Sequence, residues 1–315
     1  MAIVANTFQT YGAIGNREDL SDIIYNISPT DTPFMSSIGK EKAEGTLHEW
    51  QTDALAAAAT NAQVEGDEIA FTAVVPTSRI NNRTQISRKS VIVSGTQDTV
   101  NTAGRNQELA YQISKNAKEL KRDMELVLCN NQSAAVGGAA AARTSSGLAS
   151  WIQTNINAIG ANGAVGGTDT PGILRTNGTQ RAFTEAQLKG VAASCWNSGG
   201  DPSMIMLGSF NKQKLSGFTG GSTKMTQADD KKLVAAIDIY ESDFGSMTVV
   251  PNRFSRSRDV FVLQPDMWAV AYLRDFQMID LAKTGDAEKK AMLAEYTLVA
   301  KNEAANGAIF DLTTA

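Results

Sequence analysis

One long helix is predicted by the stretch QELAYQISKNAKELKRDMELVLCN, residues 107–130. At about 100° per residue, its apolar side chains gather on one face roughly 100° wide. That face holds Leu109, Ala110, Ile113, Ala117, Leu120, Met124, Val127 and Leu128. The candidate core contacts among them are Leu109, Ile113, Leu120, Met124 and Val127. Because a helix with one apolar stripe needs a surface to lie on, we expect the β-rich chain that follows to cover it.

The other side of this helix is charged and is expected to face solvent. It holds Lys115, Lys118, Arg122 and Glu125. Two pairs of opposite charge stand four residues apart, each worth a few tenths of a kcal/mol on an exposed helix. They are Lys115 with Glu119 and Lys121 with Glu125. Asn106 is the expected N-cap, since a side-chain oxygen there can accept from the first free backbone amides.

The composition describes a globular protein without a strongly charged tail. The chain has 315 residues, 42% hydrophobic and 20% charged, with a formal net charge of −4. No block of Lys and Arg is present, so a protein that grips nucleic acid through its phosphates is disfavoured. The length allows one elaborate domain or two ordinary ones.

Two cysteines, Cys129 and Cys195, lie in unrelated contexts. They are expected to be reduced thiols in a protein made and folded in a cytoplasm. No apolar run approaches the roughly 20 residues of a membrane span, and the first residues lack a signal-peptide pattern. We therefore expect no membrane association.

The first third of the chain has little apolar mass. Residues 1–39 are predicted to form an arm, with a short helix over residues 16–25 and a proline-containing segment before Phe34. Residues 40–97 are predicted to form a long extended hairpin with a polar tip. Phe34 and Ile38 sit on a segment too short to bury them, so they need another surface, in this chain or in a neighbour. A long polar hairpin is poorly stable alone in water.

After the long helix, a glycine-rich stretch precedes an ordered α/β block. Residues 137–179 are dominated by Gly, Ala, Asn and Thr, which favours a loop. Helices are then expected over residues 184–197 and 209–217, and the helix that opens at Thr184 carries Gln187 at the capping-box position. Strands are expected at 204–207, 233–243, 247–250, 260–263 and 268–273, the last two paired around a turn at Gln264. Within the tail, residues 278–312, the stretch 289–303 has mixed helix and strand character. The fold class is α+β.

The sequence contains no recognisable catalytic or cofactor motif. His48 is the only histidine, so two-histidine metal sites are excluded. Neither a nucleophile elbow nor a phosphate-binding glycine loop is present. A site built only from carboxylates stays open as an alternative. We predict a protein that is not an enzyme, with no catalytic, metal-binding or cofactor-binding residues and no cofactor.

The extended hairpin carries a set of basic residues that includes Arg79 and Arg83. These two share a strand face and form a basic edge. Such an edge can pair with acidic groups on another subunit. Plain solubility charge on an edge strand explains it equally well.

The order of parts resembles the major capsid proteins of tailed bacteriophages, which have the Hong Kong 97 fold. Several short sequence segments are also similar to those of one branch of these proteins. These segments are residues 16–20 (NREDL), 27–34 (ISPTDTPF), 48–53 (HEWQTD) and 295–303 (EYTLVAKNE). They are structural sequence motifs rather than catalytic signatures. The resemblance covers most of the chain.

The resemblance implies a division of the chain into six parts. These are an N-terminal arm (1–39), an extended loop lying on the neighbouring subunit (40–97), a peripheral domain with the spine helix (98–140), a glycine-rich loop (141–182), an axial domain at the five- and six-fold axes (183–269) and peripheral return strands (270–315). Candidate intersubunit contacts are Phe34, His48, Trp50, Glu65, Asp67, Glu68, Arg79 and Arg83. Many members carry a scaffolding segment before the arm; none is recognised here, so a separate scaffold, or none, is expected.

The implied function is self-assembly into the icosahedral shell of a phage head that encloses the DNA genome. The implied partners are further copies, as pentamers and hexamers, together with portal, scaffolding or decoration proteins. DNA is expected inside without sequence-specific binding. The expected location is the virion, after synthesis in the host cytoplasm. Two alternatives remain: an encapsulin-like cellular shell that encloses a cargo enzyme, and a carboxylate-only metal enzyme of small oligomeric state.

Overall fold

The computed structural model describes residues 30–69, 71, 73–100, 102, 107–159, 174–218 and 238–314. Its helices are α1 Pro33–Ser37, α2 Gly95–Thr99, α3 Glu108–Cys129, α4 Leu148–Trp151, α5 Glu185–Asn197, α6 Ser209–Ser216, η2 Pro265–Met267 and η3 Glu303–Ala305. Its strands are β1 Gly39–Lys42, β2 Leu47–Thr52, β3 Ser78–Arg83, β4 Gln85–Ser94, β5 Asn155–Asn157, β6 Met204–Leu207, β7 Ile239–Ser242, β8 Gly245–Pro251, β9 Val260–Leu263, β10 Trp268–Asp280, β11 Ala287–Ala300 and β12 Gly307–Ile309. The helix predicted over residues 16–25 and the cap predicted at Asn106 lie outside the described residues.

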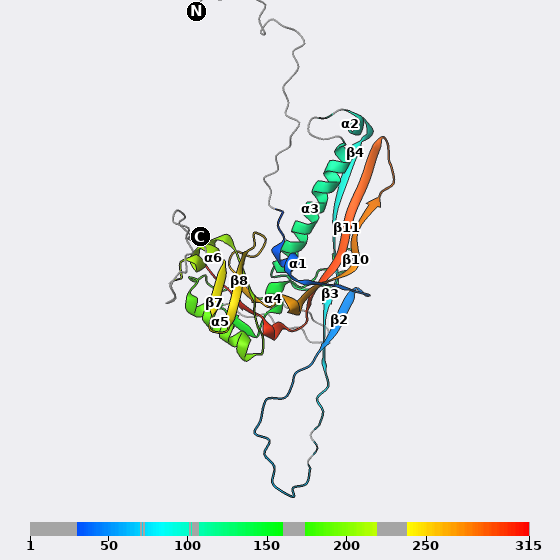
Figure 1. The fold of residues 1–315 in the computed structure, drawn as a ribbon. Helices are drawn as coiled ribbons and strands as arrows, with labels where there is room; N and C mark the ends of the chain where they lie inside the picture. The colour runs from blue at the N-terminus through cyan, green and yellow to red at the C-terminus, as the bar shows by residue number, and fades with distance from the viewer. Residues whose placement is uncertain are drawn as a thin grey trace, which may run out of the picture.

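Two sheets carry the fold, which is α+β as predicted (Figure 1). A four-stranded sheet has the order β1-β10-β11-β4, and a six-stranded sheet has the order β5-β12-β9-β6-β8-β7. A separate two-stranded hairpin, β2-β3, opens into a long loop. Figure 1 shows α3 running along the four-stranded sheet. The long loop projects from the end of the molecule opposite to α2.

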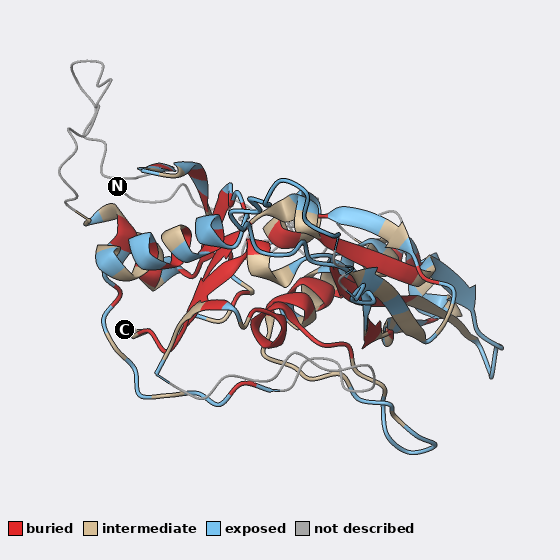
Figure 2. Ribbon diagram, turned by 90° about the horizontal axis from the view of Figure 1, so that it is seen from below, coloured by how far each residue is buried: buried red, intermediate tan, exposed pale blue. Residues whose placement is uncertain are grey.

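The main core lies where α3 meets both sheets. Leu120, Met124 and Leu128 of α3 are fully buried together with Trp268 and Tyr296 of the four-stranded sheet. Leu109 is also buried, whereas Ile113 and Val127 are half-buried. Figure 2 shows this concentration of buried residues, in red, in the central strands. The apolar stripe of α3 therefore does attach the helix to the β structure.

Glu125 corrects the sequence prediction of a solvent-facing charged side. Its carboxylate is fully buried and accepts hydrogen bonds from the backbone amides of Phe34 (2.8 Å) and Met35 (2.9 Å) and from Asn252 Nδ2 (2.7 Å). Burial raises the pKa of Glu125, and the three hydrogen bonds oppose that rise. The predicted pair with Lys121 is therefore replaced by bonds to backbone and amide donors. The Lys115–Glu119 pair does form, at 3.9 Å.

The N-terminal segment is held by the same contacts. Phe34 opens α1, and its ring is fully buried 6.4 Å from the ring of Trp268. Phe34 was a candidate intersubunit contact, and the structure corrects this because its side chain has no surface left for a neighbour. The sequence left open whether Phe34 is covered by its own chain or by a neighbour. Its own chain covers it.

A second core lies on the other face of the six-stranded sheet, under α5. The helix begins as predicted: Thr184 and Gln187 form a reciprocal capping box. Leu188, Val191 and Cys195 of α5 pack on this face. Gly307 permits the close approach, since a Cβ there would lie 2.4 Å from Val191 Cγ1. Burial raises the pKa of the Cys195 thiol to about 12, as expected for an inert thiol.

Several strand predictions need correction because pairing is decided by distant chain segments. β9 and β10 do not pair with each other around Gln264; β9 belongs to the six-stranded sheet and β10 to the four-stranded one. The tail region of mixed character is the long strand β11.

The extended hairpin is also shorter than predicted. β1 pairs in parallel with β10, and β4 pairs with β11, so only residues 47–83 belong to the hairpin and its loop. Similarly, β5 and β12 belong to the six-stranded sheet, although β5 lies before and β12 after the other strands of that sheet in the sequence. The sequence patterns of these strands gave no sign of their partners.

We predict that Leu120→Asp prevents formation of a stable soluble subunit. A carboxylate without partners at this fully buried position costs several kcal/mol, against a total stability of about 5–15 kcal/mol. Thermal unfolding followed by circular dichroism measures the effect. Leu126→Asp is the control, since Leu126 on the same helix is 48% exposed and should tolerate the change. Wild-type melting of the Leu120 variant is the result that contradicts the packing described here.

We also predict that Glu125→Gln destabilises the subunit by about 1–3 kcal/mol at neutral pH, because an amide offers one acceptor atom where the carboxylate offers two. Glu125→Ala should cost more, since it leaves three donors without their acceptor. Urea unfolding of the soluble subunit provides the measurement. Glu119→Gln is the control, because its pairs with Lys89 and Lys115 are long, at 3.9 Å. Equal stability of the Glu119 and Glu125 variants contradicts the stabilising role of the hydrogen bonds that Glu125 accepts.

Candidate functional site

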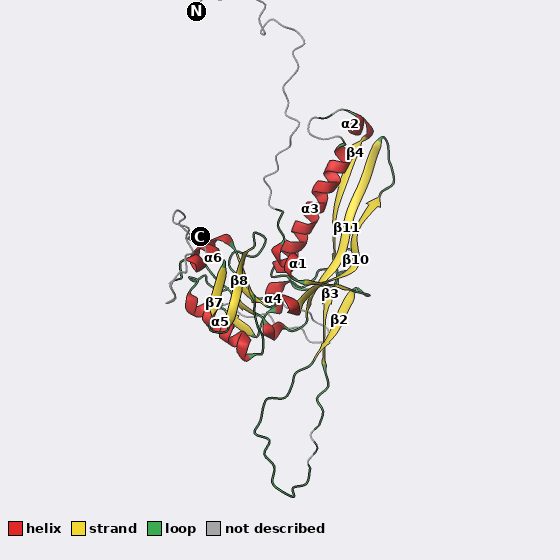
Figure 3. Ribbon diagram, viewed as in Figure 1, coloured by secondary structure: helices red, strands yellow, loops and turns green. Residues whose placement is uncertain are grey.

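The most distinctive surface is the long loop between β2 and β3, which we call the extended loop and define as residues 53–77. Figure 3 shows it in green, as an irregular excursion beyond the two strands. Every described residue from Asp53 to Thr77 is exposed. The loop therefore contributes almost nothing to either core.

The extended loop is richer in apolar residues than the sequence analysis recognised. Its large apolar side chains are Leu55, Val64, Ile69, Phe71, Val74 and Val75. Leu55 is 100% exposed and Phe71 96% exposed. The description of the tip as having few apolar anchors is thus wrong. The missed signal was the local density of apolar residues in IAFTAVV, residues 69–75. A contiguous set of uncovered apolar side chains is typical of an interaction surface.

The acidic tip residues are also exposed. Glu65, Asp67 and Glu68 form no ion pair with any described residue. Within the loop, the tip is closed by a turn in which Asp67 N donates to Val64 O at 3.1 Å. Gly66 occupies this turn with a φ of 87°, a conformation that favours glycine. The intersubunit role of the three carboxylates stays a prediction.

The root of the extended loop is fixed to the body by Trp50. Its indole Nε1 donates to Ala300 O at 2.8 Å, and its ring lies 5.6 Å from the ring of Trp151. Ile80 on β3 packs against the same core. Trp50 was a candidate intersubunit contact, but its main observed role is to anchor the hairpin to its own chain.

His48 lies beside this anchor. Its ring is 5.8 Å from that of Trp50, and burial lowers the pKa of His48 against an opposing effect of Glu41. Asn82, across the strand pair, is fully buried and donates to Leu298 O at 2.7 Å. His48 is thus half-buried in its own chain, and a contact with a neighbour is a proposal only.

The basic edge on β3 is partly used within the chain. Arg79 lies 3.5 Å from Glu49 on the paired strand β2. Arg83 is half-buried, and its backbone amide donates to Asn82 Oδ1. The pairing of Arg79 with its own chain is simpler than the predicted pairing with another subunit. The side chain of Arg79 is still 57% exposed.

A buried ionic cluster around Asp311 was not foreseen from sequence. Asp311 Oδ1 accepts from Gly178 N and Arg258 Nη2, while Oδ2 accepts from Ile159 N and Arg175 Nη2, all within 2.8–3.2 Å. Burial lowers the pKa of Arg175, and Asp311 opposes this change. Asp311 has a φ of 62°, which is uncommon for a residue other than glycine.

The Asp311 cluster is explained by its structural position. It joins the chain on both sides of residues 160–173 to the segment before β9 and to the segment after β12. Its members are up to 152 residues apart in sequence, so no local motif could reveal them. The cluster therefore fastens these chain segments to one another.

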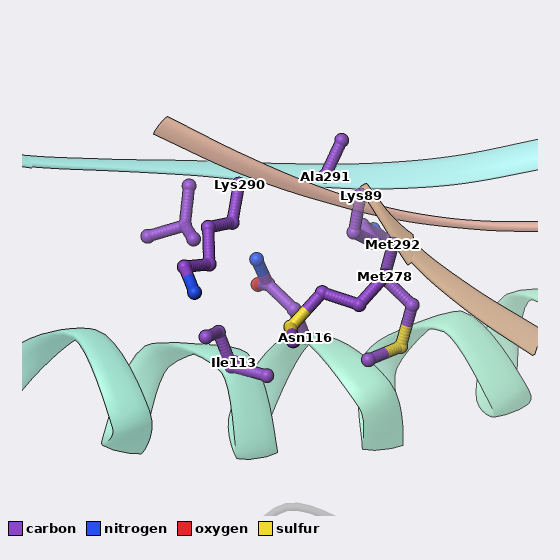
Figure 4. A pocket seen from close by; sticks show the side chains of 8 residues that line it. Lys89, Ile113, Asn116, Met278, Lys290, Ala291 and Met292 are labelled. Carbon is purple, nitrogen blue, oxygen red and sulfur yellow. The ribbon is translucent and has the colours of Figure 1, made fainter. Parts of the chain in front are cut away.

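The described residues contain no group of three or more His, Cys, Asp or Glu side chains placed to hold a metal ion. A cavity of about 10 Å³ between α3 and the sheet, shown in Figure 4, is lined by Ile113, Asn116, Met278 and Met292 among others. That volume admits about one water molecule. Burial raises the pKa of the Cys129 thiol far above its ordinary value.

A larger groove lies at the root of the extended loop. Its volume is about 330 Å³, and it is lined by Pro76, Ile80, Trp151, Ala300 and Glu303 among others. Trp151 Nε1 has no hydrogen-bond partner there. Its residues come from the hairpin, from α4 and from the end of β11 with the segment that follows it, so the groove adjoins the loop. None of the described helices could span a membrane.

Comparisons with known proteins point in one direction. The profile of the family described as SU10 major capsid protein matches residues 3–313. The major capsid protein of Escherichia phage Phieco32 is 29% identical over 338 aligned residues, covering 96% of this chain and 96% of that protein.

Solved structures agree at the level of the fold. The capsid of a native GTA particle superposes with a TM-score of 0.64 at 11% identity, over 96% of this chain and 98% of the other. The capsid of Cyanophage A-1(L) gives 0.61 at 13% identity, over 98% and 99%. The SrpI encapsulin of Synechococcus elongatus gives 0.56 at 10% identity, over 95% and 93%. These likenesses identify the Hong Kong 97 fold.

Proposed function

Since the chain belongs to the SU10 major capsid protein family, we propose that its extended loop holds neighbouring subunits together in the shell of a phage head. The protein is a structural shell protein of the virion and associates with further copies of itself. We propose that these copies form the pentamers and hexamers of a closed icosahedral shell around the DNA genome.

The observation that carries this proposal is the uncovered apolar surface of the extended loop. Complete burial of a Val, Leu, Ile or Phe side chain is worth about 1.5–3 kcal/mol. Six such side chains are 78–100% exposed, although Trp50 holds the root of the loop firmly against the body. A loop of this kind is stable only in contact with another molecule, and in a closed shell a neighbouring subunit is always within reach.

The two sheets define the two domains of the subunit. We assign the four-stranded sheet with α3 to the peripheral domain, and the six-stranded sheet with α5 and α6 to the axial domain. Because β5 and β12 pair within the six-stranded sheet, the axial domain should include them, beyond the range 183–269 predicted from sequence.

Further partners follow from the role of a shell protein. A portal, a scaffolding protein or decoration proteins should bind the assembled shell. The genome should be enclosed without sequence-specific contacts, since the net charge of −4 and the absence of a basic block disfavour tight phosphate binding.

An encapsulin-like shell is the second candidate, favoured by the fold match to the SrpI encapsulin. The two functions differ in cargo, since a phage head contains nucleic acid and an encapsulin contains protein. The sequence relationship to a phage capsid protein supports the phage reading more strongly.

We predict that the purified protein, with its scaffold where it uses one, assembles into hollow closed particles visible by electron microscopy. The reason is that the extended loop exposes apolar side chains that further copies can cover. Particles isolated from infected cells should contain DNA. A stable, monodisperse species near 33.5 kDa under assembly conditions contradicts the prediction, and particles filled with a cargo enzyme favour the second candidate.

We predict that deletion of residues 61–71 leaves the subunit folded but unable to close shells. The deleted residues are exposed, so circular dichroism and melting temperature should change little. Sedimentation should show free subunits or small oligomers instead of particles. A second variant keeps the length of the loop and replaces Val64, Ile69 and Phe71 with Ser; it should show the same defect. Loss of folding, or normal particles from both variants, contradicts the role assigned to the loop.

A further inference from the structure

Three distant chain segments meet at one end of the six-stranded sheet. Val260 opens β9 and pairs with Ile309, which ends β12, so the segment before β9 (residues 252–259) lies beside the segment after β12 (residues 310–312). Arg181 N donates to Asp311 O at 2.8 Å, which adds the segment before α5 (residues 174–183). The antiparallel pairing of two strands therefore brings the side chains of all three segments together around Asp311.

These segments carry four arginines that surround two carboxylates. We call this group the arginine cluster; its members are Arg175 and Arg181 from the segment before α5, and Arg256 and Arg258 from the segment before β9.

The arginine cluster carries more positive charge than its carboxylate partners neutralise. Asp311 lies 3.2 Å from Arg175 and 3.1 Å from Arg258. Asp259 lies 3.0 Å from Arg256. Among the described residues these are the carboxylates that pair with the cluster, so four guanidinium groups face two carboxylates. The excess is two positive charges.

Burial makes this excess unfavourable. The side chain of Arg175 is 3% exposed, and those of Arg256 and Arg258 are 15% and 20% exposed. Burial lowers the pKa of Arg175, yet an arginine keeps its proton at neutral pH. Burial also raises the pKa of Asp259 to about 6, so any proton taken up there enlarges the positive excess. A buried charge without a partner strongly destabilises a fold, and an added anion removes that cost.

Several N–H groups of the cluster also have no acceptor. Arg175 Nη1, Arg181 Nε and Arg258 Nε are buried atoms without a hydrogen-bond partner among the described residues. The orientation of Arg175 is fixed, since its Nη2 donates to Asp311 and its guanidinium carbon lies 3.7 Å from the centroid of the Phe310 ring. A buried donor without an acceptor loses its hydration with no compensation. Donors held in this way are typical of a site for a ligand with several acceptor oxygens.

We propose that the arginine cluster binds one small tetrahedral oxyanion of the phosphate or sulfate type. Its oxygens accept from the unpartnered N–H groups of Arg175, Arg181 and Arg258, and its negative charge neutralises the excess. The planar guanidinium group is suited to such ligands because its donors match the geometry of phosphate oxygens. This inference goes beyond the proposed function, since it concerns a single subunit and requires no assembly.

A free oxyanion fits the cluster better than the phosphate of a nucleic acid. A nucleic-acid strand carries its sugars and bases beside every phosphate, so the side chains that bind it have to reach the surface. Arg175 does not reach the surface, and the net charge of −4 disfavours a tight grip on a polyanion. Binding of a free oxyanion joins the segment before α5 to the segment before β9, so it should stabilise the folded subunit.

Thermal unfolding of the soluble subunit tests the proposal, with inorganic phosphate as the probe. Melting is compared in about 20 mM phosphate and in sodium chloride of the same ionic strength, at neutral pH. A ligand that binds only the folded state raises the melting temperature, and phosphate should raise it by about 3 °C. Because phosphate also stabilises proteins by exclusion from their surface, the comparison between variants is decisive.

Arg181→Gln should abolish most of the difference between phosphate and chloride. The Arg181 side chain donates one long hydrogen bond, to Phe310 O at 3.4 Å, so this variant should still fold and should melt close to the wild type in chloride. Arg258→Gln is the second variant and should lose the same difference. Arg253→Gln is the matched control, since Arg253 lies on the segment before β9 but is exposed; it should keep the full difference.

Isothermal titration calorimetry measures the binding itself. The wild type and the Arg253 variant should bind about one phosphate per subunit, and the Arg181 variant should bind it at least about tenfold more weakly. Absence of phosphate binding to the wild type overturns the proposal, and so do equal phosphate effects in the Arg181 and Arg253 variants. Tighter binding of a short single-stranded DNA than of phosphate, lost in the Arg181 variant, also overturns it, because the cluster then serves a nucleic acid.

Discussion

The buried carboxylate of Glu125 is the contact on which the rest of the subunit depends. It joins the backbone of the N-terminal segment, the long helix and Asn252, which directly follows β8 of the six-stranded sheet. An ionised carboxylate removed from water costs several kcal/mol unless hydrogen bonds replace its hydration. Three donors from two separate chain segments provide that replacement. Any displacement of α1 or of the β8–β9 connection therefore leaves a charge without partners.

The subunit consequently divides into a well-packed body and a loop that the body does not support. Two hydrophobic cores, one on each face of the six-stranded sheet, stabilise the body. The extended loop has no share in either core, yet its root is fixed by Trp50. This combination is suited to assembly, because the body has its own two hydrophobic cores while the apolar side chains of the loop stay exposed.

The sequence by itself determined the local elements and the character of the protein. The 3.6-residue spacing of apolar residues located α3 to within a residue at each end, the Thr184 capping box located α5, and the absence of catalytic motifs excluded common enzymes. The resemblance of several short sequence segments to those of phage major capsid proteins indicated the capsid fold. Only the tertiary structure decided the pairing of strands, the burial of Phe34 and Glu125 and the Asp311 cluster. Phe34 and Glu125 are 91 positions apart, and Asp311 bonds residues 53 to 152 positions away. Periodicity reports which side of an element is apolar; it carries no information about which distant donor meets a buried carboxylate.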